Sequence, residues 1–150
     1  MALVIDNANT KLSKTGLADI TVGDNLTFAD NFVKKPRLQS YAVATDTPTI
    51  IAGTVSLNLD NANAFQVSLT ANVTSISLQN VPASGRLVEI AVQFTQDATG
   101  GRTVAWPTSF KWQGGMAPTV SSTANARDIL FALTVDGGAT WNCSLAKDFR

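Results

Sequence analysis

The chain has 150 residues, with 11 basic and 11 acidic side chains, no histidine and one cysteine. A formal charge of zero provides no basic surface, so we expect neither nucleic acid nor a membrane as a partner. The absence of histidine excludes histidine-based triads and zinc sites, and Glu89 is the only glutamate. We therefore expect a protein that is not an enzyme and has no cofactor or metal.

Residues 1–43 contain short apolar groups separated by glycine and proline. Segments this short cannot bury a face by themselves and need a partner surface. The apolar run at residues 1–5 is too short for a signal peptide, which favours a chain made and kept in the cytosol. We expect residues 1–43 to form an extended arm that attaches the chain to another protein, through these side chains: Leu17, Ile20, Val22, Leu26, Phe28 and Phe32.

The sequence pattern of residues 44–150 is typical of a β domain, because β-branched residues alternate with polar ones between turn residues. Residues 49–59 predict one strand with a bulge at Gly53, on which Ile51 faces the same side as Val55. Residues 65–70 and 73–78 predict two neighbouring strands. Residues 86–96 are the longest clean alternation and predict a central strand.

Two hairpins are expected in the second half of this domain. Residues 96–101 are turn chemistry and lead from the central strand into residues 102–106. Residues 127–135, in which every second residue from Ile129 to Val135 is a large apolar one, turn back through residues 139–145. With turns at roughly every 8–12 residues, these short strands predict an all-β fold, specifically an antiparallel β-sandwich of the jelly-roll type.

Aromatic residues gather after the first hairpin, at Trp106, Phe110 and Trp112. Large rings at this place either pack in the core or a subunit interface, or stack on the apolar face of a sugar. The sequence leaves both alternatives open. A carbohydrate-active enzyme would need a pair of suitably spaced carboxylates, for which no motif argues. Cys143 lies in an alternating segment and is expected to be a small buried side chain.

Three segments carry a resemblance to a known family: residues 94–107 (FTQDATGGRTVAWP), residues 110–119 (FKWQGGMAPT) and residues 136–141 (DGGATW). With them, roughly residues 35–150 resemble the C-terminal domain of bacteriophage tail-fibre and related virion structural proteins. The resemblance implies a structural virion component that is oligomeric, commonly a homotrimer, and it brings no catalytic motif with it.

Two functions follow from this resemblance. As a tail-fibre-like protein, the chain would dock on other phage structural proteins of the tail or baseplate through its arm. Its β domain would then form a trimeric tip that contacts host surface glycan through Trp106, Phe110 and Trp112. As a capsid decoration protein, the alternative, it would lay the same arm across capsid subunits and bridge them.

Overall fold

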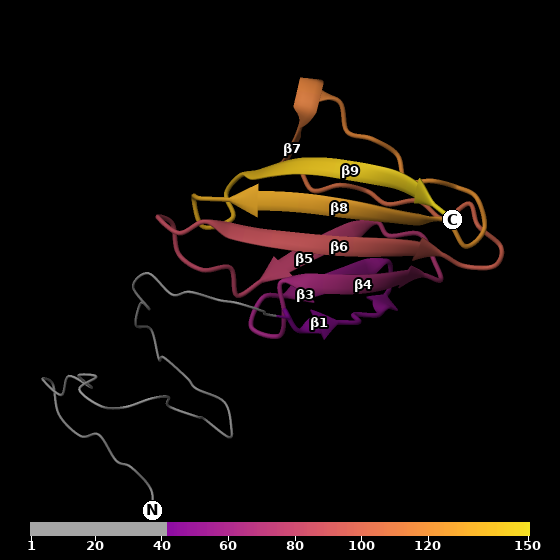
Figure 1. Cartoon of the computed structure of the whole chain (residues 1–150), viewed down its shortest axis with the longest axis horizontal. Helices are drawn as coiled ribbons and strands as arrows, with labels where there is room; N and C mark the ends of the chain where they lie inside the picture. Colours follow the sequence, from indigo (N-terminus) through magenta and orange to yellow (C-terminus); the bar gives the residue numbers. More distant parts are fainter. Residues whose placement is uncertain (1–41) are drawn as a thin grey trace, which may run out of the picture. The chain divides into compact units, whose positions relative to one another are not determined.

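The structure, a computed structural model, describes residues 42–150, and these residues form strands joined by turns and loops (Figure 1). A single 3-10 turn, η1 (Gln113–Gly115), interrupts the strands of this part of the chain. The strands, in chain order, are β1 (Thr45–Asp46), β2 (Ile50–Ile51), β3 (Thr54–Asn58), β4 (Ala64–Leu69), β5 (Ser75–Gln79), β6 (Val88–Gln96), β7 (Phe110–Trp112), β8 (Arg127–Thr134) and β9 (Trp141–Phe149).

The strands form two sheets. A six-stranded sheet has the order β1-β4-β6-β8-β9-β7, and a three-stranded sheet has the order β2-β3-β5. Figure 1 shows β6, β8 and β9 as long neighbouring strands, with β3 and β5 behind them in this view. The expected all-β fold with two packed sheets is confirmed. As expected, β6 lies inside its sheet, between β4 and β8.

The strand directions correct the antiparallel part of the expectation, because both sheets are mixed. β4 pairs with β6 in parallel and β3 pairs with β5 in parallel, whereas β8 pairs antiparallel with both β6 and β9. The reason lies in the connections. From β3 to β6 the chain alternates between the sheets, so each strand returns to its own sheet in the direction of the strand two before it.

This winding also explains two wrong pairings. β4 and β5 follow each other in the sequence but belong to different sheets, so they are not neighbours within a sheet. Residues 102–106 do not return along β6 as a hairpin. Instead Val104 forms an isolated parallel bridge with Val73, and the place beside β6 is taken by β8. The second predicted hairpin, β8 with β9, is confirmed.

The core lies between the two sheets, and strict alternation supplies it. From the six-stranded sheet come Phe65, Val67 and Leu69 of β4 and the buried residues of β6, and from the three-stranded sheet come Val55 and Leu57. Ile51 is an exception to the expectation, because it is exposed. The turn at Ala52-Gly53, where both residues have positive φ, makes a tight hairpin instead of a bulge and turns Ile51 to the outside.

Candidate functional site

The predicted site residues divide into two groups. Those of the arm, the apolar side chains between Leu17 and Phe32, lie outside the described residues. The aromatic residues Trp106, Phe110 and Trp112 lie within them and are brought together as one cluster. The rings of Trp106 and Trp112 have centroids 5.0 Å apart, and Trp106 also stacks on Phe110 at 6.4 Å.

The cluster belongs mainly to the core. Phe110 is buried and contacts the ring of Trp141, which is fully buried. Trp106 is half-buried, packs edge-on against Phe94, and donates a hydrogen bond from Nε1 to the carbonyl oxygen of Pro118 at 2.6 Å. Among the three predicted contacts, only Trp112 also lines a surface groove. The sequence could not separate these cases, because core and sugar contacts call for the same side chains.

The outward face of β8 carries the large alternating residues that the sequence pattern singled out, for which no side was predicted. Leu130 and Ala132 point into the core, and the large alternating residues point outward. Phe131 is 52% exposed, Leu133 36% and Val135 57%. Residues 129–133 are apolar in both alternating positions, a pattern typical of strands covered on both faces, and this pattern was the signal available in the sequence.

Phe131 and Leu133 form part of the floor of a groove of about 1020 Å³ on the outer face of the six-stranded sheet. The loop before β6 contributes Leu87, which is also exposed, and β7 with η1 contributes Trp112 and Gln113. The lining combines exposed apolar side chains, among them the ring of Phe131, with hydrogen-bonding ones such as Asn142. A surface of this kind suits contact with another protein and, through its rings, contact with a sugar.

Charged residues flank the floor on two sides. Glu89 of β6 is in register with Leu133 of β8, which is in register with Asn142 of β9, and Lys111 of β7 is also in register with Asn142. The groove therefore has Glu89 and, from the loop before β6, Arg86 on its β6 flank, and Lys111 on its β7 flank. All three are exposed, and Lys111 Nζ donates a hydrogen bond to the carbonyl oxygen of Thr108 at 2.8 Å.

The motif behind the resemblance forms a loop held together by its own polar groups. Gln96, at the end of β6, is 3% exposed. Its Nε2 donates hydrogen bonds to the carbonyl oxygens of Arg102 and Ser121, both at 2.7 Å, and its Oε1 accepts one from the backbone N–H of Arg102 at 2.9 Å. One buried amide thus joins residues 102 and 121, which no strand pairing connects.

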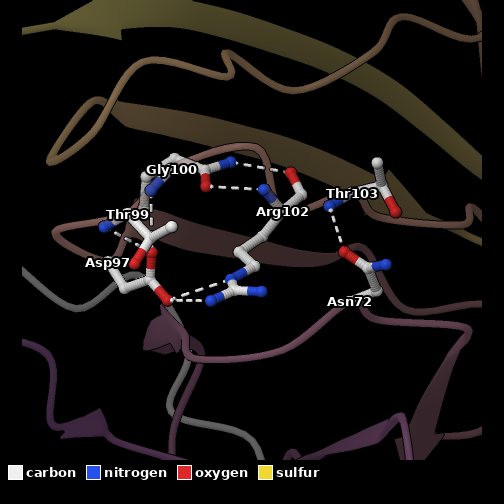
Figure 2. Close-up of polar contacts among 7 residues, drawn as sticks. Asn72, Asp97, Thr99, Gly100, Arg102 and Thr103 are labelled. Carbon is white, nitrogen blue, oxygen red and sulfur yellow. Dashed lines mark hydrogen bonds and ion pairs between the residues drawn. The ribbon is translucent and has the colours of Figure 1, made fainter.

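Asp97 completes this loop, as Figure 2 shows. Its carboxylate accepts hydrogen bonds from the backbone N–H groups of Thr99 and Gly100 and from two nitrogens of the Arg102 guanidinium, at 2.8–3.0 Å. The Arg102 guanidinium, helped by the two N–H groups, holds the pKa of Asp97 below its ordinary value of 3.8. All of these contacts are internal, so the motif is a structural element of the loop.

Gly100 is required in this loop. It has φ of 72°, and a Cβ atom there would lie 2.5 Å from the carbonyl oxygen of Ser122. Asp128 of β8 holds the loop before β8 and the end of β9. Its buried carboxylate accepts hydrogen bonds from the backbone N–H groups of Ser121 and Asp148. Each of these residues holds its neighbours in place, so a structural role is enough to explain them.

The described residues offer little for catalysis or metal binding. Within residues 42–150, no three His, Cys, Asp or Glu side chains gather in a group that could hold a metal ion. Cys143 is buried, as expected, and its burial raises the pKa of its thiol to about 12. The same part of the chain contains no helix with the length and apolar character needed to cross a membrane.

Comparison with known proteins agrees with this geometry. The chain matches the model of one protein family, described as "Putative phage tail fibre C-terminal domain", over residues 46–140. No curated protein and no solved structure matches it. The matched range begins within β1 and ends just before β9, so it covers most of both sheets and the groove lining apart from Val43 and three residues of β9. The chain therefore belongs to the phage tail fibre C-terminal domain family.

Proposed function

We propose that this protein is a non-enzymatic, tail-fibre-like structural component of a bacteriophage virion, which assembles as a homotrimer and presents its β domain to the host surface. The observation that carries the proposal is the family match, since it covers nearly the whole β domain and the family is one of tail-fibre domains. The groove supports it further. Its floor is apolar and exposed, as expected for a subunit that works within a larger assembly.

Attachment to the tail or baseplate is proposed for residues 1–43, through the apolar side chains named above. Replacing Phe28 with Asp should prevent incorporation of the protein into phage particles, because a charge cannot enter an apolar contact without a large desolvation cost. The matched control is Ser56→Asp, which places a charge at an exposed position of the three-stranded sheet, outside both residues 1–43 and the groove. Normal incorporation of the Phe28→Asp protein would contradict the proposed attachment.

Contact with host glycan is proposed for Trp112 alone among the three aromatic candidates, because Phe110 is buried and Trp106 is engaged within the cluster. Trp112 lies on β7, the edge strand of the six-stranded sheet, two strands away from β8. Its ring is therefore reached from the margin of the sheet. Trp112→Ala phage should adsorb to host cells more slowly, with particle composition unchanged, whereas unchanged adsorption would remove the glycan proposal.

The first experiment is to count copies of this chain per purified virion, relative to the major capsid protein, by quantitative mass spectrometry. A small number that is a multiple of three supports a trimeric tail fibre. A number close to that of the capsid protein would instead identify a capsid decoration protein. Absence of the chain from particles would overturn both functions.

A further inference from the structure

The apolar stripe of β8, defined as Ile129, Phe131 and Leu133 together with Val135 directly after the strand, is half-buried at Ile129 and exposed at the other three positions. β8 is an interior strand of the six-stranded sheet, with β6 on one side and β9 on the other. A sheet face of this kind is shielded from water only by another layer placed on top of it. The inner face is already covered by the three-stranded sheet, so the stripe is left for something else.

The stripe is one strand wide, and the residues on either side of Phe131 have small side chains. At the height of Phe131, the register places Ala91 of β6 on one side and Ser144 of β9 on the other. The Phe131 ring therefore stands above its neighbours. A single raised row of this shape fits an assembly in which several copies meet along a line, whereas two sheets stacked face to face need broad apolar faces.

The charges on the flanks suggest how the copies are related. Glu89 and Lys111 lie in one row across the sheet, on opposite sides of Leu133. Three strand spacings separate them, about 14 Å, so they cannot form an ion pair within one chain. If the copies are related by rotation about an axis parallel to β8, each residue has the same position along that axis in every copy. The β6 side of one copy then faces the β7 side of the next copy.

We infer that copies of this chain meet along the β8 stripe, related by rotation about an axis that runs along the stripe, with Glu89 of one copy facing Lys111 of the next. This inference rests on the homo-oligomer in the proposed function and names its surface. A second copy is the favoured occupant because one surface carries both charges needed at the contact. A foreign partner has no reason to match an acid and a base at the same height.

The first test measures the mass of the purified full chain by sedimentation equilibrium. The wild-type chain should form a discrete oligomer, and Phe131→Asp should raise its dissociation constant by about a hundredfold or more. Leu133→Gln provides a second, milder change of the stripe. Ser56→Asp, an exposed position on the three-stranded sheet, is the matched control and should associate like wild type, while circular dichroism verifies that each variant folds.

The second test exchanges the charges. Glu89→Lys and Lys111→Glu should each weaken association by about tenfold, since each places like charges on facing flanks. The double variant, E89K with K111E, restores opposite charges and should associate nearly as well as wild type. Recovery of this kind is a property of the contact itself, which loss of folding in a single variant cannot imitate.

Three results would overturn the inference: a monomeric wild-type chain at every concentration, Phe131→Asp and Leu133→Gln chains that associate like wild type, or a double variant as weak as the single ones. The first result would also contradict the homotrimer of the proposed function. The other two leave that function intact, because the copy number per virion is measured on particles and does not depend on this surface. A chain present in the virion but associating through another face would keep the function and reject the interface.

Discussion

The outer faces of the two sheets differ in a way that their inner faces do not. On the three-stranded sheet, the outward residues of β3 and β5 are all polar, with Ser56 and Ser77 typical of them, and the exception on this sheet is exposed Ile51 of the edge strand β2. On the six-stranded sheet, the outward residues of β8 include exposed Phe131 and Leu133. The strands of both sheets alternate between buried and exposed positions in the same way. Since the outer faces differ while both sheets form, folding of the domain depends on the inner faces.

An exposed apolar residue on a strand contributes little to the stability of the single domain. Its apolar surface also stays in unfavourable contact with water until a partner covers it. Ser and Thr on β3 and β5 avoid this cost, and they are the usual choice for a face that stays in water. We therefore attribute the composition of the stripe on β8 to the proposed assembly, and the first prediction below tests how separate the two faces of a strand are.

The largest effect is expected from a charge on the inner face of β6. Val92 is fully buried between the two sheets, and Val92→Asp should unfold the domain, since an unpaired buried carboxylate costs about 3–5 kcal/mol or more, a large part of the stability of a typical domain. Gln93→Asp, one residue along on the outer face, should leave folding intact. Circular dichroism and thermal melting of both variants provide the measurement, and equal losses would mean that the two faces of β6 are not distinct.

A smaller effect is expected at the loop end of the six-stranded sheet. Gln96→Leu keeps the size of the side chain but leaves the backbone N–H and carbonyl of Arg102 and the carbonyl of Ser121 without their partner. Stability should fall by about 2 kcal/mol, which lowers the melting temperature by roughly 4–8 °C.

The matched control lies beside the three-stranded sheet. Thr74 Oγ1 donates an exposed hydrogen bond to the carbonyl oxygen of Gly53, an oxygen that also accepts from two backbone N–H groups. Thr74→Val should therefore change the melting temperature much less than Gln96→Leu. Equal shifts would show that burial of the contact does not decide its contribution.

The smallest effect depends on pH. The pKa of Asp97 is lowered in the folded state, so its charged form stabilises the fold fully above the ordinary value of 3.8, and this contribution is lost as the pH falls below it. Asp97→Asn should lower stability near neutral pH and flatten the decline of the melting temperature on acidification. An acid decline as steep as that of wild type would contradict the assignment. Asp136, whose pKa is lowered mainly by the Thr140 backbone N–H, accounts for part of the decline that remains.

Much of the architecture was predictable because it depends on local pattern. The alternation along residues 88–94 identified an inner strand, and the turn residues at 136–138 identified the hairpin of β8 and β9. The parallel pairs were not predictable in this way. Whether β4 lies beside β5 or beside β6 depends on which sheet each strand enters, and no short segment contains that information.

The features of the candidate site also fall into two groups, those that depend on local pattern and those that depend on the tertiary structure. The sequence by itself determined the all-β class, the family and the loop motif at Gln96 and Asp97, since these follow from alternation and from residues close together in the chain. Only the tertiary structure decided that Phe110 is buried and that Phe131 is exposed. β8 is apolar in both alternating positions, so either set could face inward, and the buried carboxylate of Asp128 shows which one does. Its bonds to Ser121 and Asp148 exist only when the distant loops are already in place.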